Sequence, residues 1–514
     1  MSCEMTPMAR TLARSNPVRR CAGRSRDSHY WTDLTAMLIT ITDWLWSYVL
    51  IGALLIVGVR FTIGSRYVQI RLFRRTVAVL SDIEWRGSER GISSFQALAV
   101  SVAGRVGGGN IAGVAVAITL GGPGALFWMW LIALLGMSTS LFECALAQLY
   151  KRRHGEETFR GGPAYVMRYG LGWRVLPVIY SVLLLVTIGF GFNAVQSYVL
   201  TTSIESAFGV PALTSGLVMT AIMAIILFGG IRRLALVSEI IVPAMVLGYL
   251  MLALVVLALN MGQIPGALWL IVSSAFGLEQ AVGGGVAAAI AQGARRGLFS
   301  NEAGLGTVPN VAAAADVPHP MSQGLVQSLS VFIDTIILCT ATALIILMSS
   351  TYGADSGQLQ GVVMTQMAVA EHVGPGGEPL VSLALVLFAT TTIAYNSFLG
   401  ENSIAYFRAI GAEAILVFRV AVLTMIAWAS VQDLGTVFGF ADLTMALLAL
   451  TNLLALWALY PSPSHSLCIL RRKWTRGSCR GSAGISCRVR RWIPPAGHST
   501  SLTDPTTGPR ITPR

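Results

Sequence analysis

Apolar stretches of roughly 20 residues, separated by short polar connections, recur along the chain between residues 45 and 460. A helical stretch of this length spans the hydrocarbon core of a bilayer. The pattern predicts eleven membrane segments, at residues 45–63, 95–120, 125–150, 176–204, 215–228, 240–259, 266–290, 325–348, 380–405, 414–431 and 436–460. The predicted fold class is an all-α integral membrane protein.

The composition supports this assignment. Of the 514 residues 54% are hydrophobic and only 12% are charged, whereas a soluble protein carries roughly 25% charged residues. The net charge of +12 comes from the two flanks, residues 1–36 and 461–514, which hold 16 of the 36 Lys and Arg but 4 of the 24 Asp and Glu. Residues 37–460 are therefore neutral overall. The basic balance does not indicate a nucleic-acid partner, and the expected environment is the lipid bilayer.

The flanks differ in character from the hydrophobic body. Residues 1–36 lack the apolar core of a signal peptide, so we interpret them as a non-native or disordered extension, with Met37 as a plausible start. Residues 461–514 are rich in Arg, Ser, Gly, Cys and Pro without periodicity, which is typical of a disordered or frameshifted tail. The functional part of the chain is expected between residues 37 and 460.

Loop charge predicts the orientation. Five predicted loops carry Lys or Arg, and they follow segments one, three, five, seven and nine; the loop after segment seven contributes Arg295 and Arg296. The intervening loops, including residues 349–379, carry none. Basic loops stay on the cytoplasmic side. The alternation predicts a cell-membrane protein with its N-terminus outside and its C-terminus in the cytoplasm.

Two segments contain glycine clusters near their middle. One holds Gly107, Gly108 and Gly109 after Arg105, and the other, five segments later, holds residues 283–285. Glycine weakens a helix, and unpaired backbone within a membrane is tolerated only where it lines a cavity or packs on protein. A matched pair of interrupted helices is typical of a transporter site between inverted repeats. Close helix packing is the alternative interpretation.

Four long motifs resemble a known family, the alanine-or-glycine:cation symporters, also called the sodium:alanine symporter family. They are GGPGALFWMWLIALLG at 121–136, GNIAGVAVAITL at 109–120, FRGGPAYVM at 159–167 and RRGLFSNEAGLGTVPNVAAAA at 295–315. The resemblance covers about residues 44–460 in order. It implies a leucine-transporter-type fold of five-plus-five inverted repeats with two broken helices. The repeats would be residues 66–264 and 265–460, with residues 37–65 as an extra N-terminal helix.

The resemblance also implies a function and a site. It implies sodium-driven symport of alanine, glycine or a similar small neutral amino acid. The substrate carboxylate would bind freed N–H groups at a half-helix N-terminus. The expected substrate-binding residues come from both glycine clusters and two further segments: Gly107, Gly108, Gly109, Asn110, Gln196, Gly283, Gly284, Gly285 and Tyr395. For Gln196 an interhelical hydrogen bond is the alternative.

For the coupling ion, the resemblance implies a sodium site in which Thr391 and Thr392 join the carbonyl groups of Ala103 and Val106. Membrane threonines more often bond to their own helix, and that interpretation stays open. The chain departs from the family where Gly108 stands in place of a threonine and Tyr395 in place of an aromatic residue that is often tryptophan. These departures bear on affinity and substrate size.

Ionisable residues within segments are costly and indicate function or structural ion pairs. We expect Arg105 to pair with a carboxylate, and we favour fixed ion pairs for the acidic residues Glu143, Glu279, Glu302, Asp334 and Glu401. For Glu143, Glu302 and Glu401, which lie near cytoplasmic ends, a latch of the inner gate is the alternative. The alternative function is a proton-coupled small amino-acid transporter on the same fold, for which Glu279 is the residue of interest. The segments contain neither a His or Cys cluster nor a phosphate-binding loop, so we predict that the protein is not an enzyme.

Overall fold

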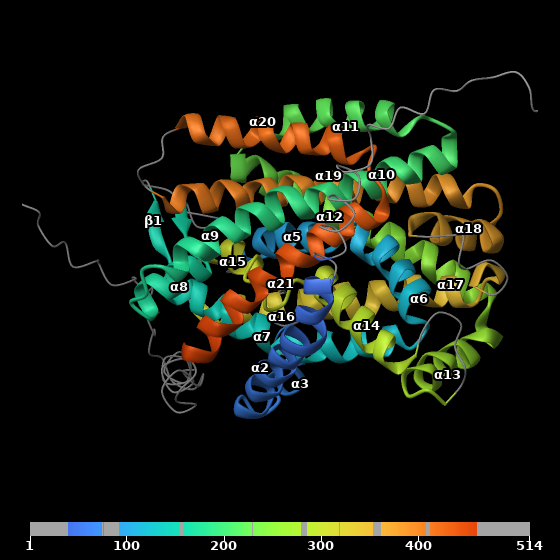
Figure 1. The fold of residues 1–514 in the computed structure, drawn as a ribbon, viewed down its shortest axis with the longest axis horizontal. Helices are drawn as coiled ribbons and strands as arrows, with labels where there is room; N and C mark the ends of the chain where they lie inside the picture. The colour runs from blue at the N-terminus through green and yellow to red at the C-terminus, as the bar shows by residue number, and fades with distance from the viewer. Residues whose placement is uncertain are drawn as a thin grey trace, which may run out of the picture.

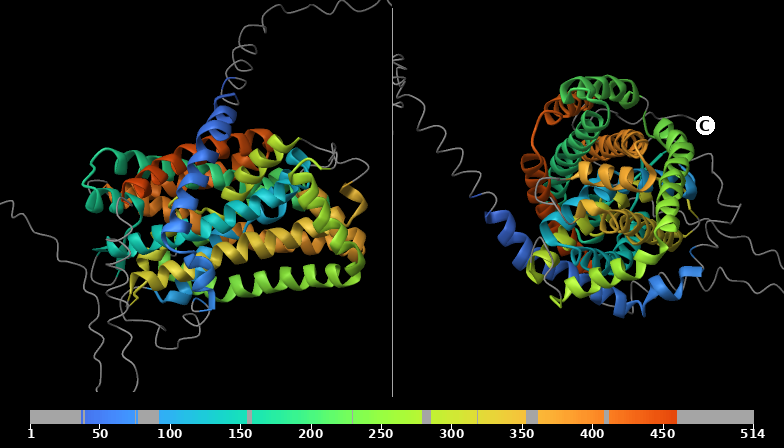
Figure 2. Two further views of the ribbon diagram at one scale, coloured as in Figure 1. Left: turned by 90° about the horizontal axis from the view of Figure 1, so that it is seen from below. Right: turned by 90° about the vertical axis from the view of Figure 1, so that its right-hand side faces the viewer.

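The computed structural model describes residues 37, 40–74, 76, 92–154, 158–228, 230–278, 285–317, 319–352, 361–407 and 412–459. Within this part of the chain the protein is a bundle of helices with a single hairpin, in which β1 (Arg152–His154) pairs antiparallel with β2 (Thr158–Arg160). Most of the long helices run in similar directions, and α2 crosses below them (Figure 1). The end-on view in Figure 2 shows helices arranged around others at the centre.

The N-terminal half contains the following helices. They are the π-helical turn η2 (Leu45–Leu50), α2 (Ile51–Gly64), α3 (Val68–Arg71), α5 (Ser94–Arg105), the π-helical turn η4 (Gly109–Gly113), α6 (Val114–Gly121), α7 (Ala125–Leu149), α8 (Pro163–Gly170), α9 (Leu176–Val186), the π-helical turn η5 (Thr187–Phe192), α10 (Asn193–Phe208), α11 (Ala212–Leu227) and α12 (Gly230–Leu259).

The C-terminal half continues in the same way. Its elements are the 3₁₀ turn η6 (Met261–Gln263), α13 (Ile264–Ala275), α14 (Val286–Asn301), α15 (Val308–Ala314), α16 (Pro320–Val331), the π-helical segment η7 (Phe332–Cys339), α17 (Thr340–Leu347), the 3₁₀ turn η8 (Ser350–Tyr352), α18 (Val362–Val373), α19 (Gly377–Tyr406), α20 (Ala412–Ala429) and α21 (Leu434–Leu459).

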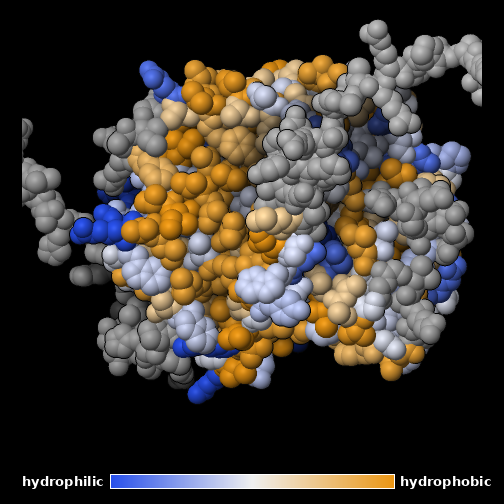
Figure 3. All heavy atoms as spheres, viewed as in Figure 1, coloured by the Kyte–Doolittle hydropathy of each residue, from blue (hydrophilic) through white to orange (hydrophobic). Residues whose placement is uncertain are grey.

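The helices have the length and composition of membrane spans. Seven continuous helical stretches in the described chain are long and apolar enough to cross a bilayer, and the bent pair formed by α5 and the helix over residues 109–121 is an eighth. Apolar residues cover much of the face that is seen in Figure 3. This confirms the all-α membrane fold. The predicted total of eleven segments stays a prediction.

Two groups of helices pack around the centre. Helix α7 lies against α14, α15 and α16, whereas α19 lies against α10, α12 and α18. Helix α5 contacts α16 of the first group and also α12 and α19. The interrupted helix α5 is therefore placed between the two groups, where its backbone can meet side chains from both.

The glycine-interrupted segment predicted at 266–290 falls on two separate helices. The structure has α13 ending at Ala275 and α14 beginning at Val286. Gly283 and Gly284 lie outside the described residues, as does Glu279, and Gly285 is an exposed residue that directly precedes α14. A further interruption follows later in the chain, between α14 and α15.

Two further loop predictions are corrected. Arg295 and Arg296 are buried within α14, because Asp43 and Asp442 neutralise them there, and they do not form a basic loop. The loop predicted at 349–379, which carries no Lys or Arg, contains α18, which packs against α19 and α17. The short length of α18, 12 residues, explains why hydropathy alone does not distinguish it from a loop.

Glycine allows α16 and α7 to approach closely, and this generates a prediction. A Cβ on Gly324 of α16 would lie 2.6 Å from the carbonyl oxygen of Leu141, whereas a Cβ on the exposed Gly248 of α12 would meet nothing within 4 Å. We expect Gly324→Ala to destabilise the protein by about 1–3 kcal/mol because backbone must move. Gly248→Ala is expected to be neutral or slightly stabilising. Thermal unfolding of the two purified variants in detergent compares them, and equal melting temperatures would contradict the packing.

Candidate functional site

The first interruption lies between α5 and η4. Helix α5 begins with a capping box, in which Ser93 accepts from the N–H of Gln96 and the Gln96 side chain accepts from the N–H of Ser93. It ends at Arg105, because Val106 adopts an extended conformation with φ −79° and ψ 97°. The helix then restarts as η4, and the two halves differ in direction by 50°. Carbonyl and N–H groups at the break are left without partners in their own helix.

The second interruption lies between α14 and α15. Glu302, Gly304 and Gly306 all have positive φ, at 53°, 100° and 80°. Glycine adopts positive φ readily at two of these positions, but the backbone of Glu302 is strained there. Residues with a strained backbone cluster at functional sites. The motif NEAGLG therefore forms the turn of a broken helix. In the described part of the chain this position is the interruption that lies against the first break.

The two interruptions lie next to each other in the described structure. The Asn110 side chain on η4 donates to Ser300 Oγ on α14 over 3.2 Å. Beside it, a Cβ on Gly109 would lie 3.0 Å from the Phe299 ring. Tyr395 of α19 packs on Gly104, where it leaves no room for a Cβ, and its hydroxyl donates to Glu302 over 3.0 Å. The broken helices thus share one buried region.

Side-chain oxygens satisfy the freed N–H groups of the first break. The N–H of Gly107 donates to Asn110 Oδ1 over 2.9 Å, and the N–H of Gly108 donates to Gln196 Oε1 over 2.9 Å. All four residues are buried. A Cβ on Gly107 would approach Thr392 Oγ1 to 2.8 Å, and one on Gly108 would approach Gln196 Oε1 to 3.1 Å. Glycine here allows neighbouring polar groups to reach the backbone.

A threonine hydroxyl satisfies the freed carbonyl groups. Thr392 of α19 lies 2.8 Å from the carbonyl oxygen of Ala103 and 3.3 Å from that of Val106. The structure thus brings three of the four predicted sodium ligands together. Thr391 instead donates to its own helix at Leu387 and Phe388, over 3.0 Å each, as membrane threonines commonly do. Its other contact is the sulfur of Met245 on α12, 3.8 Å away, whereas Thr392 contacts the carbonyl oxygens of Ala103 and Val106.

A buried carboxylate completes the polar cluster around η4. Asp334, on the π-helical segment η7, accepts hydrogen bonds from Asn110 Nδ2, Ser300 Oγ and Thr335 Oγ1 over 2.6, 2.6 and 2.8 Å. π-helical turns redirect side chains and often occur at functional sites. Asp334 was expected in an ion pair, but these partners are neutral. The carboxylate is instead held by three short, charge-assisted hydrogen bonds.

The second break is satisfied in the same manner. Glu143 of α7 accepts from the N–H of Gly304 over 3.3 Å, and Asn452 of α21 donates to both Glu143 and the Gly304 carbonyl. The Tyr180 hydroxyl donates to the carbonyl of Leu305 over 3.1 Å. The expected fixed ion pair of Glu143 is thus replaced by hydrogen bonds to backbone and amide groups.

Arg105 is also held differently from the expectation. Its guanidinium donates to the Gln327 carbonyl and Ser140 Oγ over 3.0 Å each and, at closer range, to Ser330. These partners are neutral oxygens, not a carboxylate. Arg105 is 2% exposed, so in the described structure it contributes an unpaired positive charge to the region between the two breaks.

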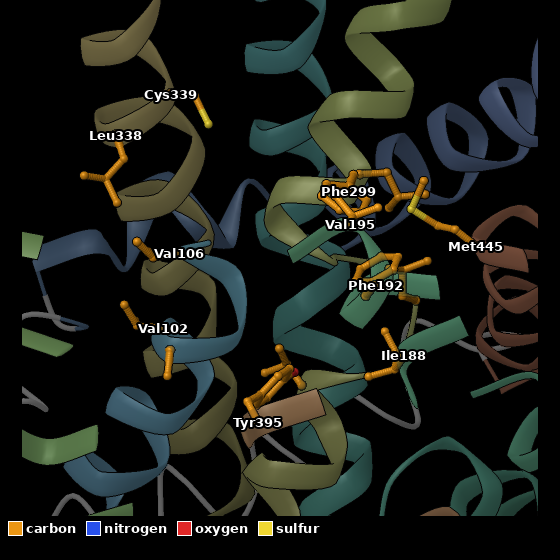
Figure 4. Packing of buried hydrophobic residues seen from close by; sticks show 14 of the residues in the cluster. Val102, Val106, Ile188, Phe192, Val195, Phe299, Leu338, Cys339, Tyr395 and Met445 are labelled. Atoms are coloured by element: carbon orange, nitrogen blue, oxygen red, sulfur yellow. The ribbon is translucent and has the colours of Figure 1, made fainter. Parts of the chain in front are cut away.

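Apolar side chains form one wall of this region. Phe299, Val195 and Phe192 gather beside Met445 on the side of Gly109, and Tyr395 lies below them (Figure 4). The Phe192 and Phe299 ring centroids are 4.5 Å apart. A ligand whose charged end binds the polar cluster would place its side chain against such a wall.

Several residues of this region are not predicted from the sequence. Asn452, Thr307, Ser300 and Tyr180 all bond to a break or to a carboxylate beside it. A polar residue in an otherwise apolar helix is a usable signal for Asn452, but hydroxyl residues occur throughout the segments. Their role emerges only when the helices are assembled.

Comparison with known proteins is consistent with this geometry. A family profile described as the sodium:alanine symporter family matches residues 31–477. The chain is 42% identical over 417 residues to the probable sodium/glutamine symporter GlnT of Bacillus subtilis, covering 81% of this chain and 86% of that protein. It is 35% identical over 432 residues to the sodium/alanine symporter AgcS of Methanococcus maripaludis, covering 82% and 94%.

The fold also matches a solved structure. The crystal structure of MhsT in complex with L-phenylalanine superposes with a TM-score of 0.54 at 15% sequence identity, covering 75% of this chain and 96% of MhsT. The likeness confirms the leucine-transporter-type fold. The repeat boundary at residues 264 and 265 stays a prediction.

The Asn110–Asp334 hydrogen bond can be tested by a double-mutant cycle. We expect Asn110→Ala and Asp334→Ala to show a coupling free energy of about 1.5–3 kcal/mol, the range for a hydrogen bond to a charged group. Unfolding in detergent measures the stability of the two single variants and the double variant. Additive effects, with coupling below about 0.5 kcal/mol, would show that the two side chains do not interact.

Proposed function

This chain belongs to the sodium:alanine symporter family, and we propose that it carries a small neutral amino acid, such as alanine or glycine, across the cell membrane together with sodium. One observation carries the proposal. The Thr392 hydroxyl and the carbonyl oxygens of Ala103 and Val106 converge at the break of α5, beside the N–H groups of Gly107 and Gly108. Oxygen ligands for a cation and N–H donors for an anion are thus adjacent.

The sodium ion would bind to the three oxygens at the first break. Hard cations prefer carbonyl and hydroxyl oxygen, and these oxygens are supplied by α5 and α19, which belong to different parts of the bundle. An ion bound here would draw the two helices together. Because Thr391 faces its own helix, we propose Ala103, Val106 and Thr392 as the ligands from the predicted set.

The amino acid would bind at the adjacent glycines. Its carboxylate would take the N–H groups now held by Asn110 and Gln196, next to the positive end of the restarted helix. Its side chain would lie against the wall that includes Phe299. Gly108 lacks the hydroxyl usual in the family, so Gln196 supplies the polar contact at that position. A role for Gly285 is not supported by its exposed position.

We further propose that the N-terminus lies outside and the C-terminus in the cytoplasm. The four remaining basic loops support this orientation, although Arg295 and Arg296 no longer contribute. Helix α2 runs parallel to α21, because Asp442 and Trp46 are linked at one end and Arg60 lies over the Trp457 ring at the other. The first and last helices would then enter the membrane from the same side.

Thr392 provides the most direct test of the sodium site. We expect Thr392→Val to weaken the apparent affinity for sodium about tenfold. The substitution removes one oxygen ligand, worth about as much as a hydrogen bond, and leaves the shape of the side chain unchanged. Thr390→Val is the matched control, since Thr390 on the same helix bonds to Val386 of its own backbone. Sodium titration of alanine uptake into vesicles measures both. A larger effect of the Thr390 variant would contradict the assignment.

The substrate is tested by competition. In vesicles with an inward sodium gradient, we expect unlabelled alanine and glycine to compete with labelled alanine and arginine to have no effect, because a second charge has no partner against the apolar wall. Glutamine belongs in the panel because of the name of the GlnT relative. Accumulation driven by a pH gradient without sodium would overturn sodium coupling and favour the proton-coupled alternative.

A further inference from the structure

The region between the two breaks contains more negative than positive charge. Glu143, Glu302 and Asp334 are each at most 2% exposed, and Arg105 is the positive charge among them. The other buried arginines of α14 are cancelled elsewhere, since Arg295 and Arg296 pair with acidic residues of other helices. With all three carboxylates ionised, this region carries two uncompensated negative charges, which is costly away from water.

A sodium ion at Thr392, as proposed above, would supply one of the missing charges. Only this step, the charge supplied by sodium, rests on the proposed function. One more positive charge is then needed near the breaks. The hydrogen-bond partners of the three carboxylates indicate where it is held.

Two of the carboxylates accept hydrogen bonds from N–H groups. Glu143 accepts from the backbone N–H of Gly304 and from Asn452 Nδ2. Asp334 accepts from Asn110 Nδ2 on one oxygen and contacts the hydroxyls of Ser300 and Thr335 with the other. An N–H group cannot accept a hydrogen bond from a protonated carboxyl group. The N–H donors therefore favour the ionised form of Glu143 and of Asp334, whereas the carboxyl group of Glu302 contacts hydroxyl groups alone among its hydrogen-bond partners in the described structure.

Glu302 differs from them. Its carboxyl group contacts the hydroxyls of Thr307, over 2.6 Å, and Tyr395, over 3.0 Å. A hydroxyl can donate or accept, so these two partners can serve a protonated carboxyl as well as a carboxylate. Glu302 also has the strained left-handed backbone, with φ 53°, at the turn of the second break. Its side chain links that turn to α19.

We propose that Glu302 holds a proton in this closed arrangement and that loss of this proton opens the contact between the second break and α19. The proton supplies the second missing positive charge. When it is lost, a third buried carboxylate becomes ionised, and the contact with Tyr395 is destabilised by repulsion from Glu143 and by desolvation. Protonation of Glu302 therefore favours the closed packing of the broken helix.

Other ionisable groups surround Glu302 and must be separated from it. On the elements packed around the break they are Glu143 and Cys144 of α7, Arg105 of α5, Tyr180 of α9, Tyr395 of α19 and Asp334 of η7, with Arg295 and Arg296 paired further along α14. Beyond the spans, burial lowers the pKa of Lys151 to about 8. Measurements below that pH keep Lys151 mainly charged.

Thermal unfolding of the full-length protein in detergent between about pH 5.5 and 7.5 tests the proposal without relying on transport. A carboxyl group that is protonated in the fold and ionised in the unfolded chain makes stability fall as pH rises. We expect the wild type to lose stability over this range. Glu302→Gln, which stays neutral, should remove most of the loss. The control is Glu401→Gln, because Glu401 also lies on α19 but pairs with Arg419 over 2.7 Å at a partly exposed position; it should keep the wild-type slope.

Sodium-driven alanine uptake, with the same pH on both sides of the vesicle, gives a second measurement. Wild-type uptake should fall about threefold or more across this pH range, whereas E302Q should remain active with a nearly flat profile. Absence of uptake in every variant, together with the expected melting curves, would reject the proposed function and leave the Glu302 proton supported. An E302Q variant that keeps the wild-type pH dependence of stability would overturn the proton assignment.

An infrared measurement decides the matter if E302Q does not fold. A protonated carboxyl group has a C=O stretching band that disappears on ionisation. The wild type should show a buried band that titrates over this range, and Glu143→Gln and Asp334→Asn should both retain it, because neither removes Glu302. Loss of the band in either variant, or its absence from the wild type, would overturn the proposal.

Discussion

The structure depends on one constraint: backbone groups released where a membrane helix is interrupted must be paired within the protein. At the first break Asn110 and Gln196 take the N–H groups, and Thr392 takes the carbonyl groups. At the second break Glu143 accepts from the N–H of Gly304, and Asn452 donates to the Gly304 carbonyl. The polar side chains of the bundle centre are therefore there because the two helices are broken, and a ligand that binds the breaks replaces partners that already exist.

The same constraint explains how the ion and the amino acid can be coupled. The oxygens proposed for sodium come from α5 and α19, and the donors proposed for the carboxylate follow directly after α5. Either ligand would fix the same interrupted backbone, so binding of one would prepare the site for the other. The protonation state of Glu302 would also affect the second break, because Glu302 connects that break to Tyr395.

The first break could be predicted from the sequence and the second could not. Three glycines after Arg105 indicate an interruption directly, and Thr392, Ala103 and Val106, which the resemblance assigns to a sodium site, are in contact in the structure. The triplet at 283–285 was a stronger compositional signal than NEAGLG, yet the interruption in the described chain uses Glu302, Gly304 and Gly306. The number of glycines in a stretch does not show which residues adopt positive φ. Likewise, the charged Arg296 was expected in a loop, because its partner Asp442, 146 residues away, is unknown before the fold is built.

The two facing interruptions together form the proposed binding site. An experimental structure of the protein with alanine and sodium would show whether they do. We expect the alanine carboxylate at the N–H groups of Gly107 and Gly108, and the ion between Thr392 and the carbonyl oxygens of Ala103 and Val106. Alanine bound elsewhere, with α5 continuing unbroken into α6, would contradict it.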